Sequence, residues 1–178
     1  EDGSVLRGTV HDPTSRAMGG VAGHAGLFTT AHDLARYARM ILNGGELEGV
    51  RILKRETVNL MRSVQSPKYI TARRGLGFDL DSPYAGPRGN KFPLGSFGHS
   101  GWTGTSLWID PFSKTIVIFL SNRNHPGGGS VVSLRHQLGT LAAEAIDYDF
   151  SSVPGSLKKL TKNDRNAAAK KLVPPRGA

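Results

Sequence analysis

The segment between Ser96 and Ser121 constrains the fold of this chain most, because it contains three closely spaced runs that favour β-strands. A predicted turn with proline at its second position, Asp110-Pro111-Phe112-Ser113, separates the last two runs. Strands joined by such short connections pair antiparallel. The last run is continuously apolar and β-branched, which is typical of a strand covered on both faces. We therefore predict an antiparallel meander whose strands are Phe97–Thr103, Thr105–Ile109 and Thr115–Leu120.

Helices are predicted on both sides of this meander. Thr30 and Asp33 form a capping-box-like pair, and an apolar stripe at helical spacing follows them up to Asn43-Gly44-Gly45. Its members are Leu34, Tyr37, Ala38, Ile41 and Leu42. A shorter helix is expected from about Arg55 to Val64, with Val58, Met61 and Val64 buried. A C-terminal helix should bury the stripe Leu134, Leu138, Leu141, Ala142 and Ala145.

The order of these elements predicts an α+β fold, an antiparallel sheet covered by helices, because helices and strands do not alternate. Residues 1–65 are expected to form a glycine-rich loop plus a helical portion. Residues 66–150 should hold the antiparallel β meander and the C-terminal helix of the same domain, with a weak strand signal at 75–80 and a loop at 83–93. Residues 151–178 are expected to be a basic, flexible tail.

The charge of the chain is concentrated in this tail. The 178 residues carry a formal net charge of +9, of which +6 falls in residues 151–178. A basic, aromatic-poor, proline-containing tail is usually solvated, so nucleic acid is not the expected partner, although an anion-binding tail remains an alternative. The chain has no cysteine, which excludes disulfides and cysteine nucleophiles. No apolar run is long enough to span a bilayer, and residues 1–4 have neither the basic nor the apolar region that would predict a signal peptide. The sequence does not indicate a single cellular compartment.

Gly98-His99-Ser100-Gly101-Trp102 is the candidate catalytic segment. A nucleophile elbow would need glycine where Trp102 stands, and a helix after it, so that interpretation fails. Taken alone, the segment is more often a strand-end turn. A metal site at His11, Asp12 and His24 is not expected either, because their spacing is unlike that of common ligand sets; loop hydrogen bonding suits these side chains better.

Taken with three other segments, this one resembles the serine β-lactamase and penicillin-binding-protein superfamily. His99-Ser100-Gly101 followed by Trp102 to Pro111 is similar to the third active-site motif of that superfamily, which lies on an edge strand lining the cleft. Leu120-Ser121-Asn122-Arg123 and the segment from Gly26 to Leu34 also resemble the superfamily. Val10 to Pro13 with Gly19 to Gly26 is similar to the subgroup of class-C-like esterases and low-molecular-weight penicillin-binding proteins. The resemblance spans residues 8–147.

The resemblance implies hydrolysis of an ester, β-lactam or peptide bond through an acyl-serine, without metal or other cofactor. It implies an electropositive, hydrogen-bonding role for His99, a donor role for Ser100 and close substrate approach at Gly101. The backbone N–H of Trp102 would form half of the oxyanion hole. Thr103 and Gly104 would contact the substrate. Members of this superfamily are often periplasmic or secreted, and a cytoplasmic location is also compatible with the sequence.

The nucleophile expected from this resemblance is missing from the chain. Ser-x-x-Lys occurs once, as Ser156-Leu157-Lys158-Lys159, in the basic tail and after the third motif; neither Tyr-x-Asn nor Ser-x-Asn occurs. We therefore expect this chain alone to be inactive. Two explanations stay open: a C-terminal portion of a hydrolase whose N-terminal half supplies the serine, or a non-catalytic binding module derived from the same fold.

Overall fold

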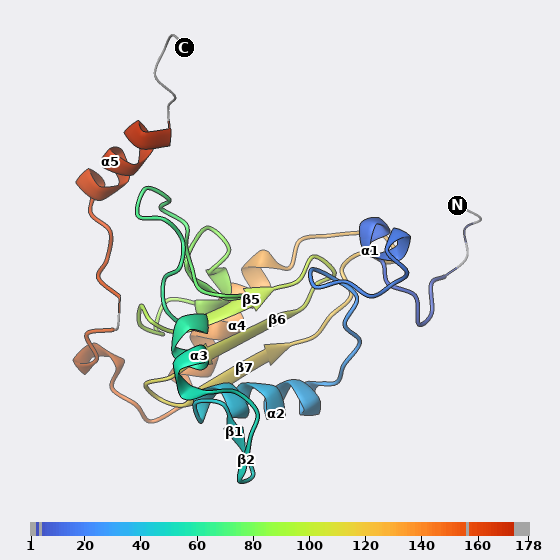
Figure 1. Ribbon diagram of the computed structural model, residues 1–178, viewed down its shortest axis with the longest axis horizontal. Helices are drawn as coiled ribbons and strands as arrows, with labels where there is room; N and C mark the ends of the chain where they lie inside the picture. Colours follow the sequence, from blue (N-terminus) through green and yellow to red (C-terminus); the bar gives the residue numbers. More distant parts are fainter. Residues whose placement is uncertain (1–2, 4, 156, 173–178) are drawn as a thin grey trace.

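A five-stranded antiparallel sheet forms the centre of the molecule (Figure 1). The computed structural model describes residues 3, 5–155 and 157–172. The strands follow one another in the order β3-β4-β5-β6-β7, and each pairs antiparallel with its neighbour. The predicted α+β class and meander are confirmed. The strands are β3 (Arg73–Arg74), β4 (Asp79–Asp81), β5 (Phe97–Ser100), β6 (Ser106–Asp110) and β7 (Thr115–Phe119).

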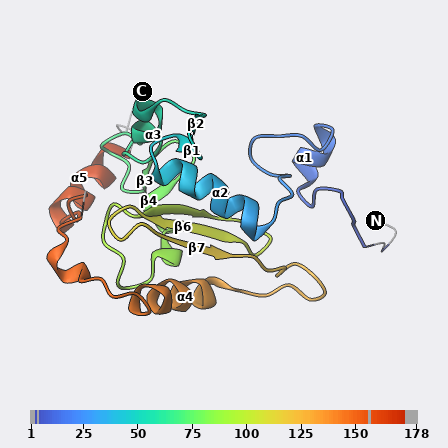
Figure 2. The same ribbon diagram turned by 90° about the horizontal axis from the view of Figure 1, so that it is seen from below.

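Two helices cover opposite faces of the sheet, α2 (Ala31–Leu42) and α4 (Val132–Glu144) (Figure 2). Helix α2 begins where the sequence predicts, because Thr30 Oγ1 accepts the N–H of Asp33 at 3.2 Å and donates to its carboxylate at 2.9 Å. The N-terminus of α4 has no side-chain cap. No helix in the described part of the chain is long and apolar enough to cross a membrane.

The core consists of two clusters, one on each face of the sheet. Trp108 and Ile109 are consecutive residues of β6 that point to opposite faces, and both are buried. Ile116 packs against the cluster on the α2 side and Val117 against the cluster on the α4 side. Strand β7 is therefore covered on both faces, as its continuous apolar sequence predicts.

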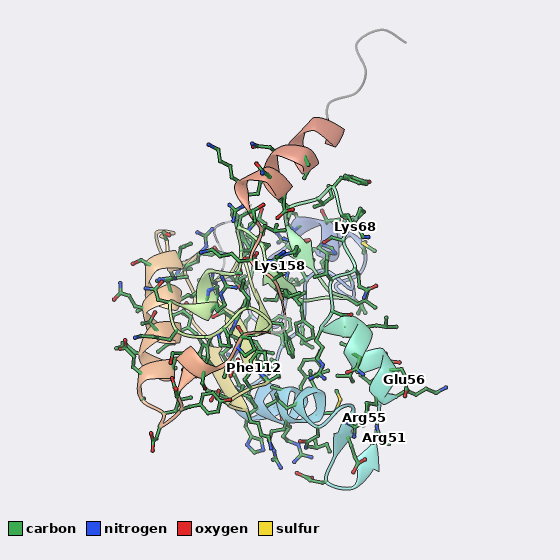
Figure 3. All side chains as sticks on the ribbon, turned by 90° about the vertical axis from the view of Figure 1, so that its left-hand side faces the viewer. Arg51, Arg55, Glu56, Lys68, Phe112 and Lys158 are labelled. Carbon is green, nitrogen blue, oxygen red and sulfur yellow. The ribbon has the colours of Figure 1, made fainter. Side chains whose placement is uncertain are left out.

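Shorter elements complete the structure around this sheet. A hairpin follows α2, with Glu48 and Gly49 both at positive φ in its two-residue turn. Figure 3 shows the side of the molecule with this hairpin and α3, and it labels Arg51, Arg55 and Glu56 there. The elements are α1 (Pro13–Ala17), β1 (Glu46–Leu47), β2 (Val50–Arg51), α3 (Arg55–Met61), η1 (Gly86–Arg88), η2 (Phe150–Ser152) and α5 (Lys162–Leu172).

The contact face of α4 differs from the prediction. Leu134 and Leu141 are exposed, and the buried residues are instead Arg135, Gly139 and Ala143, spaced four apart. Small residues in this row let the helix approach η1 closely: a Cβ at position 139 would collide with the Pro87 carbonyl. Shape, not hydrophobicity, therefore selects the packed face.

The predicted boundaries also shift elsewhere. Helix α3 ends at Met61 rather than near Val64, and the weak strand predicted at 75–80 is replaced by the short pair β3 and β4. Strand β5 ends at Ser100 rather than Thr103, because a tight turn follows. In the predicted tail, the backbone carbonyl of Lys158 accepts a hydrogen bond from Arg73, and α5 is helical. Ser156 of the tail Ser-x-x-Lys lies outside the described residues. The flexibility of the tail stays a prediction.

Candidate functional site

His99 and Ser100 occupy the carboxyl end of β5. On one side they pair with Leu107 and Ser106 of β6. On the other side, the register between β4 and β5 contains the single pair Asp79↔Gly98 within the described residues. Strand β5 is thus an inner strand, not the edge strand that the resemblance implies. Its last two residues nevertheless extend beyond the pairing with β4, which leaves that edge of the backbone accessible.

A β-turn at residues 101–104 connects β5 to β6. The Gly104 N–H donates to the Gly101 carbonyl at 3.2 Å, and the Gly101 N–H donates to the Thr105 carbonyl at 2.7 Å. A Cβ on Gly101 would collide with Thr105 Oγ1. Gly104 has φ +116°, a conformation that L side chains rarely adopt. The sequence Gly-Trp-Thr-Gly therefore fits this turn for steric reasons.

Two arginines hold the backbone carbonyls of this turn. Arg135 of α4 donates from Nη2 to the Gly101 carbonyl at 2.7 Å. Arg123 donates from Nε to the Trp102 carbonyl at 2.7 Å, and its guanidinium stacks over the Trp102 ring at 4.4 Å from the centroid. The Trp102 side chain is 73% exposed, and its backbone N–H donates to no acceptor among the described residues.

A buried carboxylate lies behind His99. Asp79 of β4 is fully buried; its Oδ1 accepts from Ser82 at 2.7 Å and lies 2.9 Å from Arg74 Nε. Its Oδ2 has no hydrogen-bond partner and lies 3.9 Å from His99 Nε2, which is longer than a hydrogen bond. The His99 side chain is 57% exposed. The imidazole is thus placed between solvent and a buried negative charge.

These groups surround a cavity of about 440 Å³. It lies between the end of β5, η1 and the start of α4. His99, Ser100, Gly101 and Trp102 line it, whereas Thr103 and Gly104 are not part of its lining. The other lining residues are Arg74, Asp79, Pro83, Tyr84, Gly86, Pro87, Arg123, Val131, Val132 and Arg135.

A second hollow, of about 570 Å³, contains none of the predicted site residues. It is lined by α3 residues, by the β6–β7 turn and by Leu157. Figure 3 labels Phe112 of that turn on the face that also carries Lys158. We therefore place the site at the smaller cavity, where the candidate chemical groups converge.

The remaining candidate side chains lie elsewhere. Asp12 Oδ1 accepts from the Ser15 N–H at 2.7 Å and is 2.9 Å from His24 Nε2, so the hydrogen-bonding role predicted for these side chains is confirmed for Asp12 and His24. Both contacts lower the pKa of Asp12, the Ser15 hydrogen bond most. His11 and His32 are exposed. The part of the chain that the structure describes holds no group of three His, Asp or Glu side chains suited to a metal ion.

Sequence reasoning missed Asp79, Arg74 and Arg135. Asp79 lies 20 residues before His99, and Arg135 lies 34 residues after Gly101, so only folding brings these residues together. One signal was available for Arg135: it is a cation among the small and apolar residues of α4. Burial lowers its pKa, and Arg123 lowers it further.

Comparison with known proteins places this chain among β-lactamase-like proteins. Residues 2–141 match the family described as Beta-lactamase. A Salmonella typhi protein named "Putative D-alanyl-D-alanine carboxypeptidase" is 36% identical over 158 residues, which are 87% of this chain and 36% of that protein. A Salmonella gallinarum protein of the same name matches with the same identity and coverage. The chain thus spans about a third of the length of these relatives.

A solved structure agrees in fold. The crystal structure of a β-lactamase from Mycobacterium bovis superposes with a TM-score of 0.51 and 22% sequence identity. The match covers 67% of this chain and 45% of that protein. At this level of identity, the similarity establishes the fold alone.

Proposed function

The chain belongs to the beta-lactamase family of serine hydrolases, and we propose that it forms one wall of an acyl-transfer cleft. In this proposal His99 and Ser100 hydrogen-bond the substrate, Gly101 allows its close approach, and the Trp102 N–H is half of the oxyanion hole. Thr103 and Gly104 complete the substrate-contacting turn. The substrate contains an ester, β-lactam or peptide bond. The carboxypeptidase name of the Salmonella relatives favours the peptide bond among these.

One observation carries the proposal: an unbonded backbone N–H lies next to an exposed imidazole and a hydroxyl at the same cavity. The Trp102 N–H has no acceptor among the described residues, and His99, Ser100 and Trp102 all line the 440 Å³ space. A preorganised N–H that reaches the developing oxyanion stabilises the negative charge of a tetrahedral intermediate. The imidazole adds a second hydrogen-bonding group beside it.

The proposal also assigns the nucleophile to residues that this sequence does not contain. Ser-x-x-Lys is found here only in the tail, and the matched relatives have almost two thirds of their length outside the match. The proposed partner of this wall is therefore the N-terminal half of the same protein, carrying the acylated serine. Without that serine, acyl transfer lacks its covalent step.

Covalent labelling tests this assignment. The 178-residue chain and the product of the complete coding sequence are each incubated with a fluorescent penicillin and with a fluorophosphonate. We expect label on a serine upstream of Glu1 in the longer protein and none on the 178-residue chain. Label on the shorter chain would contradict the assignment of the nucleophile.

The role of His99 is tested in the longer protein. His99→Ala should slow acylation by about 10²-fold, the lower end of the loss caused by removing one hydrogen-bond donor to the reacting group. His32→Ala is the matched control, since His32 is exposed in the first turn of α2, and it should leave the rate unchanged. Equal rates for both variants would remove His99 from the mechanism. A longer protein that takes up no label would favour the non-catalytic binding module.

A further inference from the structure

Arg135 occupies an unusual position directly behind the proposed oxyanion donor. Its side chain projects from α4 and is 9% exposed. Its Nη2 donates to the Gly101 carbonyl at 2.7 Å, while its buried Nε has no hydrogen-bond partner. Burying a guanidinium with a single strong hydrogen bond carries a large desolvation penalty. This penalty indicates a function for Arg135 beyond packing.

The peptide bond between Gly101 and Trp102 connects this contact to the site. The Gly101 C=O and the Trp102 N–H belong to one planar unit, and the one cis peptide bond in the described residues is His125–Pro126. In a trans peptide, the C=O and N–H point in opposite directions. A bond that fixes the direction of the Gly101 carbonyl therefore also fixes the direction of the Trp102 N–H.

The charge of Arg135 also favours the Trp102 N–H as an oxyanion donor. A cationic donor on the carbonyl polarises the peptide, which strengthens the N–H at its other end. Within the described residues, Arg135 forms no ion pair with a carboxylate, and the charged group that shifts its pKa is a second cation, Arg123, which lowers it. Positive charge thus remains uncompensated next to the place where negative charge would develop.

Arg123 also binds this turn. Its side-chain Nε donates to the Trp102 carbonyl, and its backbone N–H donates to the Thr103 carbonyl at 2.9 Å. These bonds fix the two peptide units that follow the Gly101–Trp102 unit. Arg123 holds the rest of the turn, whereas the side chain of Arg135 binds the carbonyl of the peptide that carries the proposed oxyanion donor, at 2.7 Å against 3.2 Å for the Gly104 N–H that closes the turn on the same carbonyl.

We propose that Arg135 is a positioning residue for the oxyanion hole, which orients and polarises the Trp102 N–H through the Gly101–Trp102 peptide. This inference rests on the proposed function of Trp102 and adds the group that makes its N–H effective. The residue that performs this role lies on α4, 34 residues after Gly101.

The test on the 178-residue chain measures backbone order at Trp102. In the wild-type chain, the ¹⁵N order parameter of Trp102 should match rigid backbone, about 0.85. Arg135→Met should lower it towards the flexible range, below about 0.6, with the change confined to residues 101–104. Arg135→Lys keeps a cationic donor and should retain most of the order. If the methionine variant does not fold, Arg135→Gln, whose side chain is two bonds shorter, takes its place.

Arg88→Met is the matched control. Arg88 is also partly buried, its pKa is also lowered by burial, and it donates to the backbone carbonyl of Leu80 outside the turn. This variant should leave the order parameter of Trp102 unchanged. An unchanged order parameter of Trp102 in the Arg135→Met chain would overturn the inference. So would an equal decrease of this order parameter in the Arg88→Met chain.

Acylation by the complete protein is the second readout. Arg135→Met should reduce the acylation rate by about 10²-fold, comparable to the loss of one oxyanion donor, with little change in initial substrate binding. An equal loss in binding and rate would instead indicate general damage to the cleft and would contradict the inference. If the complete protein forms no acyl-enzyme, the proposed function fails, while the order parameters still decide whether Arg135 positions the peptide.

Discussion

Replacing Gly104 by alanine tests the physical basis of the turn that carries the candidate site. Gly104 has φ +116°, and a Cβ there would lie 2.6 Å from Ser121 Oγ and 3.0 Å from the backbone N of Arg123. The backbone strain costs about 1–3 kcal/mol. The Ser121 hydroxyl, which donates to the Gly104 carbonyl at 2.7 Å, must also move, which costs about 1 kcal/mol. We therefore expect Gly104→Ala to lower the free energy of unfolding by about 2–4 kcal/mol.

Urea unfolding of the 178-residue chain, followed by tryptophan fluorescence, measures this loss. Trp102 and Trp108 report on the turn and on the core respectively. The matched control is Gly127→Ala: Gly127 has no positive φ, and a Cβ there meets nothing within 4 Å. The control should stay within about 0.5 kcal/mol of wild type. A Gly104→Ala chain as stable as the control would refute the argument from backbone conformation and close contact.

Three further predictions concern buried residues outside the site. Ser96→Ala removes the acceptor of the buried Trp108 Nε1–H, at 2.9 Å, and should cost about 1–3 kcal/mol of unfolding free energy in urea. Gly139→Ala should destabilise the same transition despite its gain of about 1 kcal/mol in helix propensity, because the new methyl collides with the Pro87 carbonyl; a more stable variant would contradict this packing. Burial raises the pKa of Asp110 above 3.8, so the folded chain holds the proton more tightly than the unfolded chain. Relative to Asp110→Asn, the wild type should therefore lose stability as pH rises through the folded-state pKa, and a difference that stays flat from pH 3.8 upward would refute the assignment.

The meander could be predicted because its signals are local. Short connections and β-branched runs determine β5 to β7, and the Thr30 cap determines the start of α2. The outer strands β3 and β4 could not be predicted in this way. They contain mostly charged residues, which are depleted in strands, and cross-strand ion pairs hold them: Arg73 with Asp81 and Arg74 with Asp79. These pairs become visible only when the register is known.

Helix α4 shows a second limit of sequence analysis. Hydrophobic periodicity assumes that the most apolar stripe faces the core. Here the row of Arg135, Gly139 and Ala143 faces inward, while Leu134 and Leu141 face outward. Close approach to η1 decides the rotation of the helix, and this rotation also directs Arg135 towards the Gly101 carbonyl. The error in the predicted face and the failure to find Arg135 thus have one cause.

The candidate site combines residues of the motif with residues of other segments that bind or surround them. The motif residues His99, Ser100 and Trp102 line the cavity, and they carry an imidazole, a hydroxyl and a backbone N–H without an acceptor among the described residues. The groups around them lie on other segments: Arg123 and Arg135 bind carbonyls of the turn, and Asp79 on β4 lies 3.9 Å from His99 without a hydrogen bond to it. A motif alone therefore cannot establish that its N–H is oriented, since a flexible turn with the same sequence would not be preorganised. The hydrogen bonds from outside the motif are what distinguish this turn from an ordinary strand-end turn.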